Sequence, residues 1–85
     1  MKTRVAVISI ILEDTVHVED VNQILHIYGG YIIGRMGLPY RAKGVHIICV
    51  AVDAPEDVIS TIAGKLGRLD GVTSKTAYSH VITEA

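Results

Sequence analysis

The sequence predicts an α+β protein with the ferredoxin-like fold, a sandwich whose elements follow the order βαββαβ. Four strand-like segments and two amphipathic helical segments alternate in that order along the 85 residues. Right-handed crossovers arrange such a chain as an antiparallel sheet in the order 4-1-3-2, with both helices on one face. The first and third predicted strands are the most apolar, as central strands should be. The second and fourth carry glycine, proline or alternating polar residues, which suit edge strands.

The first predicted strand spans residues 4–12 and is apolar on both of its faces. Val5, Val7 and Ile11 share one face of the extended chain, interrupted by Ser9. The alternate residues share the other face: Ala6, Ile8, Ile10 and Leu12. This pattern predicts a strand that is buried on both sides.

A polar connection over residues 13–17 leads into the first predicted helix. The apolar residues of this helix recur at helical spacing and form one stripe: Val18, Val21, Ile24, Leu25 and Tyr28. Glu19 and Asp20 lie in the first turn, where the helix dipole favours negative charge. We expect the helix to stop at Gly29 and Gly30, because glycine adopts the left-handed C′ conformation at little cost.

The second and third predicted strands span residues 31–40 and 45–52, joined by a turn. Gly34, Gly37 and Pro39 indicate that the second strand is an edge strand or carries a bulge, because proline cannot donate to a strand ladder. The third strand is apolar on both faces apart from His46.

The second helix is predicted to begin at the sequence Asp-Ala-Pro-Glu, residues 53–56. Asp53 is expected to cap this helix, with Glu56 reaching back toward it, and proline is tolerated in the first turn. The buried stripe consists of Val58, Ile59, Ile62, Ala63 and Leu66. Gly67 is a natural C′ residue. The final strand, residues 72–82, is expected to be the more solvated one, because one of its faces carries Thr73, Lys75, Ala77 and Ser79.

The length and composition predict one domain over residues 1–85. Hydrophobic residues make up 49% of the chain and charged residues 20%. This composition is apolar for so short a chain, because a small domain has a high ratio of surface to volume and should need more polar residues. Two helices cover one sheet face, yet the first and third strands are apolar on both. We therefore predict sheet-to-sheet or edge-to-edge pairing with another copy, in a homodimer or homotetramer.

The formal net charge is −1, from eight basic and nine acidic residues. Phosphate binding requires a basic patch, so we expect no direct contact with nucleic acid, and membrane binding through basic residues is likewise not expected. The longest apolar run, residues 5–12, is too short to span a bilayer. Cys49 is the single cysteine and cannot form an intrachain disulfide, so a cytoplasmic location is expected.

Two glycine-bearing segments carry a resemblance to a known family. They are residues 34–40, Gly-Arg-Met-Gly-Leu-Pro-Tyr, and residues 64–72, Gly-Lys-Leu-Gly-Arg-Leu-Asp-Gly-Val. They resemble a small bacterial family of iron-only hydrogenase system regulators, and the resemblance covers nearly the whole chain. That family is similar to ACT domains and to the C-terminal, metal-sensing domain of nickel-responsive repressors. The resemblance implies an ACT-like oligomer with a regulatory role near hydrogenase genes.

The sequence departs from these relatives where they bind DNA, metal or amino acids. The repressors carry a ribbon-helix-helix segment ahead of this domain, whereas here the first strand begins almost at Met1. We therefore expect any link to transcription to run through a DNA-binding partner protein. The repressors also use a His-x-His pair with a cysteine, whereas here His46 is followed by two isoleucines and Cys49. ACT domains commonly carry a glycine in the first strand-to-helix loop, and residues 13–17 contain none.

Metal binding and catalysis are both disfavoured by the sequence. The residues of metal-ligating type are His17, His26, His46, His80 and Cys49. The topology places His17 and His46 near one end of the sheet and His26 and His80 near the other, so we expect no metal or cofactor within one chain. A metal site between subunits stays open. We expect no enzyme, because no nucleophile lies beside an acid–base pair and no glycine-rich phosphate loop is present.

A ligand site built from the two glycine-bearing segments is the remaining candidate. Its residues are Gly34, Arg35, Met36, Gly37, Tyr40, Gly64, Lys65 and Gly67. The strand directions bring both segments to one end of the domain, at a sheet edge where a second subunit can pair. Arg35 and Lys65 supply basic groups, and Tyr40 supplies a wall. The alternative is structural, an edge-strand bulge with a solvated arginine and a helix end with a favourable cation.

The sequence thus predicts a small oligomeric regulatory domain that binds a small-molecule effector. A purely structural oligomerisation module and an intersubunit metal-sensing domain are the alternatives.

Overall fold

The computed structural model describes residues 1–13 and 17–84, so residues 14–16 of the predicted acidic connection lie outside the described residues. The elements follow the predicted order, with two additional 3-10 turns. They are β1 (Lys2–Leu12), α1 (Val18–Ile27), η1 (Gly29–Tyr31), β2 (Ile32–Tyr40), η2 (Arg41–Lys43), β3 (Val45–Ala54), α2 (Glu56–Gly67) and β4 (Val72–Glu84).

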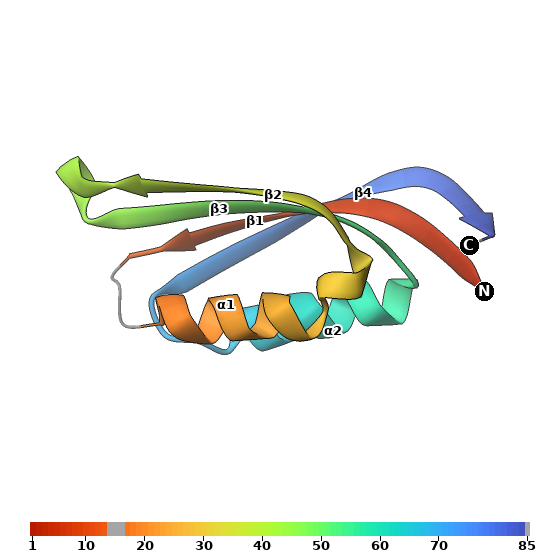
Figure 1. Cartoon of the computed structure of the whole chain (residues 1–85), viewed down its shortest axis with the longest axis horizontal. Helices are drawn as coiled ribbons and strands as arrows, with labels where there is room; N and C mark the ends of the chain where they lie inside the picture. Colours follow the sequence, from red (N-terminus) through yellow and green to blue (C-terminus); the bar gives the residue numbers. More distant parts are fainter. Residues whose placement is uncertain (14–16, 85) are drawn as a thin grey trace.

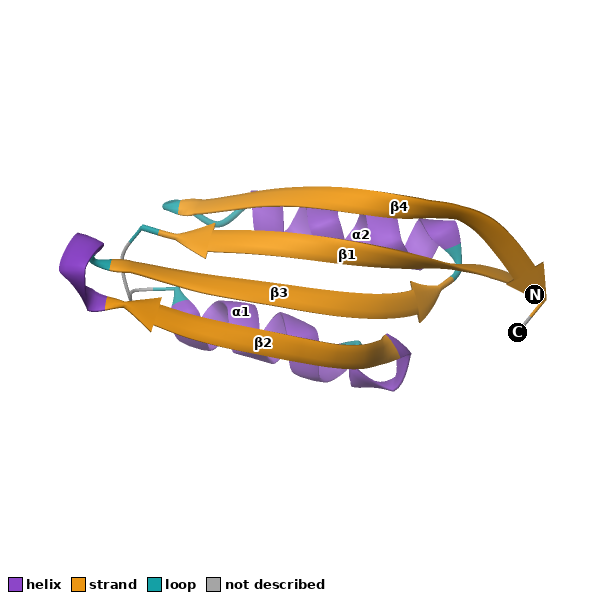
Figure 2. Ribbon diagram, turned by 90° about the horizontal axis from the view of Figure 1, so that it is seen from above, coloured by secondary structure: helices purple, strands orange, loops and turns teal. Residues whose placement is uncertain are grey.

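The four strands form one antiparallel sheet with β1 and β3 at its centre. On β1, Arg4 to Leu12 pair with β3, and the strand also pairs along its other edge with β4. The second strand, β2, pairs with β3. The resulting order, β2-β3-β1-β4, is the predicted order 4-1-3-2 read from the other edge (Figure 2). The ferredoxin-like fold is therefore confirmed.

Both helices lie on one face of the sheet, with α1 beneath β2 and β3 and α2 beneath β1 and β4 (Figures 1 and 2). Alternate strand residues and the helical stripes meet between the two layers. The large side chains that are fully buried there are Ile8, Ile10, Leu12, Val21, Leu25, Ile48, Val50, Val52, Ile59, Ile62 and Leu66. No helix in the described part of the chain is long and apolar enough to cross a membrane.

Within a single chain, β1 is buried on one side only. Ala6, Ile8, Ile10 and Leu12 face the helices and are at most 1% exposed, whereas the exposed fractions of Val5, Val7 and Ile11 are 40–43%. The prediction of a strand buried on both sides is therefore wrong for the isolated chain. Both helices cover the same face, so the apolar residues of the other face remain open to solvent.

The helix ends differ from the sequence-based expectation. After α1 the chain continues into η1, where the N–H of Tyr31 donates to the carbonyl of Tyr28 at 3.0 Å. Gly67 is the last residue of α2 and is followed by Arg68 in a right-handed conformation. Among the described glycines, only Gly44 and Gly71 have positive φ, at 65° and 74°. The left-handed caps predicted at Gly29 and Gly67 are therefore wrong, because each helix leaves through a tight right-handed turn.

The predicted Asp53 cap of α2 is also wrong. Pairing with Arg4 extends β3 as far as Ala54, so Asp53 is still part of the strand when the chain turns. Pro55 becomes the N-cap residue, and it makes no side-chain cap hydrogen bond. Glu56 instead forms an ion pair with Arg4 at 3.2 Å.

A bulge interrupts β4 opposite Val5. Arg4 pairs with Ile82 and Ala6 pairs with Tyr78, so three residues of β4 lie opposite one residue of β1. Arg4 fills this irregularity, because its Nε and Nη2 atoms both donate to the carbonyl of Ser79, at 3.0 and 2.5 Å. Beyond the bulge β4 arches away from the helical layer before it reaches its end (Figure 1).

Candidate functional site

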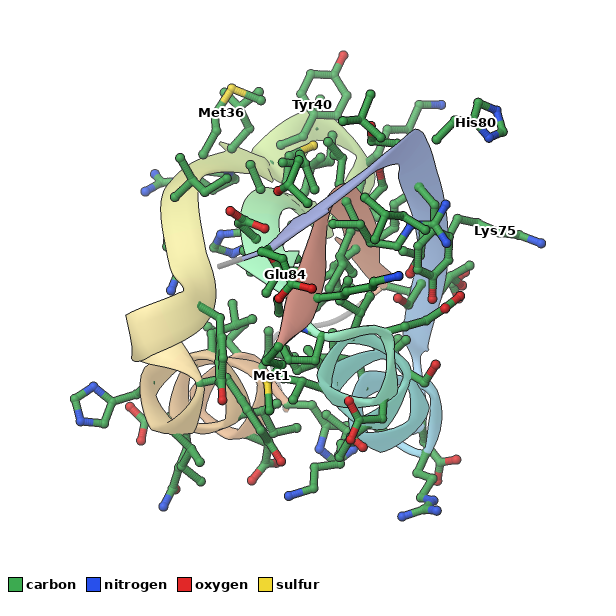
Figure 3. All side chains as sticks on the ribbon, turned by 90° about the vertical axis from the view of Figure 1, so that its right-hand side faces the viewer. Met1, Met36, Tyr40, Lys75, His80 and Glu84 are labelled. Atoms are coloured by element: carbon green, nitrogen blue, oxygen red, sulfur yellow. The ribbon has the colours of Figure 1, made fainter. Side chains whose placement is uncertain are left out.

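The sheet face opposite the helices is a continuous apolar surface, which we call the open face. It collects the alternate residues of all four strands, because side chains two positions apart on a strand share one side. Its apolar members are Val5, Val7, Ile11, Met36, Leu38, Tyr40, Val45, Ile47, Cys49, Ala51 and Ala77. Figure 3 shows Met36 and Tyr40 on the side of the sheet away from the helices.

The strand register orders these residues into rows that cross the sheet. One row contains Met36, Cys49, Ser9 and Lys75, each opposite the next on the neighbouring strand. The adjacent row contains Gly34, Ala51, Val7 and Ala77. The second row consists of small side chains apart from Val7, so it forms a depression beside the larger residues of the first row.

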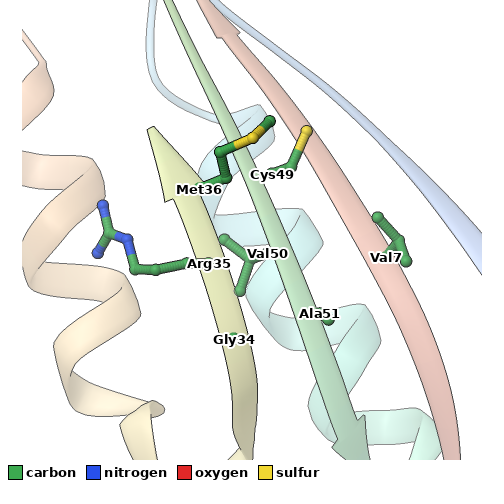
Figure 4. A pocket seen from close by; sticks show the side chains of 7 residues that line it. All are labelled: Val7, Gly34, Arg35, Met36, Cys49, Val50 and Ala51. Atoms are coloured by element: carbon green, nitrogen blue, oxygen red, sulfur yellow. The ribbon is translucent and has the colours of Figure 1, made fainter. Parts of the chain in front are cut away.

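A shallow hollow of about 330 Å³ lies in this depression near the β2 edge. Its lining comprises Val7, Gly34, Arg35, Met36, Cys49, Val50 and Ala51 (Figure 4). The missing side chain of Gly34 helps to create the hollow, because a Cβ placed there would meet nothing within 4 Å. Met36 is 51% exposed and borders the hollow, and the half-buried Cys49 thiol belongs to its lining.

The structure places the predicted ligand residues of β2 on both sides of that strand. Gly34, Met36 and Tyr40 belong to the open face, whereas Arg35 points toward α1 (Figure 4). There an Nη2 donor of Arg35 reaches the Oδ1 atom of Asn22 at 2.8 Å. Gly37 faces the helical side as well, where its Cβ position lies 3.8 Å from Nε2 of His46.

The predicted ligand residues of α2 belong to the helical layer. The end of α2 and the end of β2 point to the same end of the molecule (Figure 1), but the Lys65 side chain extends toward α1. Its Nζ atom lies 5.2 Å from the centre of the Tyr28 ring. Gly64 and Gly67 lie in the last turns of the same helix, and Cβ atoms there would meet nothing within 4 Å. One chain therefore separates Lys65 from Met36 and Tyr40 by the thickness of the sheet.

A second hollow, of about 280 Å³, lies at the end of the β2–β3 hairpin. It is lined by Pro39, Tyr40, Arg41, Gly44, Val45 and His46. Two of these residues, Tyr40 and Arg41, carry a phenol and a guanidinium that can donate to an anionic group, whereas the imidazole of His46 lies on the helical side, beside Gly37. Tyr40 belongs to the predicted site, but Arg41 and His46 do not. The turn that follows an edge strand is the sequence signal that points to Arg41.

Among residues 1–13 and 17–84, no group of three or more His, Cys, Asp or Glu side chains comes together to hold a metal ion. Asp14 of the first strand-to-helix connection lies outside the described residues. His17 contacts a carboxylate in the first turn of α1, with 2.8 Å between its Nδ1 atom and Oδ2 of Asp20. That pair is exposed and lies on the helix surface rather than in a hollow.

Comparisons with known proteins agree with this architecture. Residues 4–76 match the model of a TM1266-like family described as "Iron-only hydrogenase system regulator, putative". The structure of the uncharacterized protein TM1266 from Thermotoga maritima superposes with a TM-score of 0.87 and 32% sequence identity, covering 89% of this chain and 96% of that one. No curated protein matches the sequence significantly.

More distant solved structures share the fold. One is a formyltetrahydrofolate deformylase from Pseudomonas putida KT2440, with a TM-score of 0.63 and 15% identity over 86% of this chain and 28% of that one. Another is CPII from Thiomonas intermedia K12, bound to ADP, AMP and acetate, with a TM-score of 0.57 and 14% identity. It covers 100% of this chain and 93% of CPII. At such identities the likeness concerns the fold alone.

Proposed function

The chain belongs to the TM1266-like family of iron-only hydrogenase system regulators, and we propose that it works as a regulatory module that acts through self-assembly rather than catalysis. The observation that carries this proposal is the open face. A complete side of the sheet presents large apolar side chains to solvent, and contiguous apolar patches of this kind mark interaction surfaces.

The size of the open face suits association between copies. Four strands about 4.8 Å apart, with nine paired residues of about 3.4 Å each along β1 and β3, give a face of roughly 590 Å² before side-chain relief is counted. A stable interface removes about 800 Å² of accessible surface from each partner. Because side chains protrude from the sheet, the accessible surface of the open face is larger than its flat area. The open face is therefore large enough to supply the surface that one partner buries in a stable interface.

A small-molecule effector is the second part of the proposal. The hollow at the hairpin end supports it, because Tyr40 and Arg41 both line it. A small organic anion with a carboxylate or phosphate group suits these donors. Regulation of transcription would involve a separate DNA-binding protein, since a net charge of −1 supplies no general attraction to nucleic acid.

The assembly part of the proposal is tested by placing a charge on the open face. We expect Val7→Lys and Ile11→Lys to convert an oligomer into a monomer, because a buried ammonium without a partner is strongly unfavourable. Multi-angle light scattering at several protein concentrations measures this. Ile27→Lys is the matched control, because Ile27 is 63% exposed at the end of α1, away from the open face.

The control variant should keep the oligomeric mass of the unmodified protein, and circular dichroism should show native secondary structure in all three variants. A clean monomer for the unmodified protein at micromolar concentration would contradict assembly. Retention of the oligomer in both open-face variants would contradict assembly through this face.

A further inference from the structure

We propose that the hollow beside Gly34 is the seat for a side chain of a second copy, and that the side chain it receives is Met36 of that copy. This inference rests on the proposed self-assembly and deepens it, because it specifies which residues meet. On the open face, the half-exposed side chain of Met36 lies directly beside the hollow.

The shape of this region is self-complementary. Met36 and the depression formed by Gly34 and Ala51 lie in adjacent rows of the same face. In a two-fold contact any patch meets the identical patch of the partner, so residue i meets j and j meets i. An axis passing between Met36 and the depression therefore directs each Met36 into the hollow of the other copy. The unbranched thioether of methionine adapts well to irregular gaps of this kind.

The charges on the open face also favour a second copy over an unrelated partner. Lys75 lies at the β4 edge in the row of Met36, and Asp53 lies on the central strand β3 opposite Val5, so the open face carries both signs of charge. A second copy presents both signs in return. A partner of uniform charge would be attracted by one of these residues and repelled by the other.

The glycine at position 34 makes the inference directly testable. Its φ lies outside the left-handed region, and a Cβ there would meet open space. A larger side chain can therefore be added without a clash inside the chain. We expect Gly34→Leu to fill the hollow and to raise the dissociation constant of the assembly by roughly tenfold to a hundredfold, the range typical of overpacking a fitted contact.

Gly30→Leu is the matched control. It adds the same side chain at a glycine of η1 where a Cβ would also meet nothing within 4 Å, outside the open face. We expect its dissociation constant, measured by sedimentation equilibrium, to stay within a factor of about two of the unmodified value. The double variant Gly34→Leu with Met36→Ala should recover association relative to Gly34→Leu alone, because the smaller side chain leaves room for the added leucine.

Cys49 provides an independent measurement, because its thiol belongs to the lining of the hollow. We expect its reaction with a maleimide to slow as the protein concentration rises through the assembly range, and to remain fast in Gly34→Leu.

The outcomes separate this inference from the proposed function. Dissociation of Val7→Lys with unchanged association of Gly34→Leu would overturn the seat and leave assembly through the open face standing. A double variant no better than Gly34→Leu, or a Cys49 thiol equally reactive at all concentrations, would also overturn the seat. A monomeric unmodified protein would overturn both proposals.

Discussion

At the scale of single residues, Arg4 links three parts of the molecule. Its guanidinium donates twice to the carbonyl of Ser79, pairs with Glu56 and lies 4.8 Å from the centre of the Tyr78 ring. The side chain is 16% exposed, whereas that of Glu56 is 65% exposed. The bonds to the carbonyl of the bulge should therefore contribute more to stability than the ion pair, because an exposed partner is well screened by water.

We expect Arg4→Ala to lower the free energy of unfolding by about 2 kcal/mol, the order of magnitude for charged hydrogen bonds left unmade in a partly buried place. Glu56→Gln should change it by less than about 1 kcal/mol, since only the exposed pair is weakened. Urea unfolding at one fixed protein concentration measures both. Equal losses in the two variants would show that Arg4 stabilises the fold through its ion pair with Glu56 and not through its hydrogen bonds to the carbonyl of Ser79.

The role of Arg4 could not be predicted from the sequence, and neither could the role of Asp53. Both depend on the register between β1 and its neighbours, which fixes Arg4 opposite Ala54 and Ile82. The local pattern around Asp53 resembles a helix cap, and pairing with Arg4 overrides it by extending β3. Residues whose partners are distant in the sequence are thus where local rules fail.

At the scale of elements, Gly44 and Gly67 differ in whether the backbone requires a glycine at that position. Gly44 ends the η2 turn with a φ of 65°, where a Cβ is unfavourable. Gly67 occupies the last turn of α2 without positive φ, and a Cβ there would meet nothing. Glycine within a helix is destabilising relative to alanine.

We therefore expect Gly44→Ala to lower the free energy of unfolding by about 1 kcal/mol. Gly67→Ala should raise it by up to about 1 kcal/mol, because alanine is the better helix former. The comparison of the two variants in urea gives the sign directly. A loss in Gly67→Ala as large as that in Gly44→Ala would restore the left-handed cap that the sequence suggested.

Element order and sheet order were predictable because they rest on period and polarity. The spacing of Val21, Leu25, Ile59 and Leu66 identifies the buried helix stripes before any contact is known. The backbone conformation at the helix ends was not predictable in this way. In η1 and in the turn after α2, residues of right-handed conformation supply the hydrogen bonds to the last carbonyl groups, and no left-handed glycine is needed. Glycine is compatible with both kinds of ending.

At the scale of the whole molecule, the candidate sites differ in how far sequence could locate them. The open face follows from strand alternation, which already assigns Val7 and Ile11 to one side. The hollow within it does not, because it requires Gly34, Ala51 and Val7 to share one row across three strands. The predicted combination of Arg35 with Lys65 remains a prediction about two chains, since within one chain Arg35 bonds to Asn22 of α1 and Lys65 lies over the ring of Tyr28.

The effector proposal is tested on the intact assembly by native mass spectrometry after gentle purification. We expect the mass of the assembly to exceed the summed mass of its protein chains. The excess should equal the mass of one small anion for each occupied hairpin-end hollow. Arg41→Gln should lose this addition, because the guanidinium provides the charge that holds it. Lys43→Gln is the control, since Lys43 shares the η2 turn but does not line the hollow. No added mass, or equal retention in both variants, would favour a purely structural module.

Each edge strand of the sheet is interrupted by an irregularity, and these irregularities limit the addition of further molecules along the edges of the sheet. On β2 the pairing shifts between Ile32 and Gly34, and Pro39 offers no N–H. On β4 the bulge lies opposite Val5 and Lys75 occupies the edge. A straight margin with free hydrogen-bonding groups invites strand after strand from other molecules, and irregular margins discourage it. Both edges of this sheet are therefore poorly suited to seeding a fibre, so the proposed contact between copies falls to the open face, where a two-fold pair leaves no free surface for a third copy.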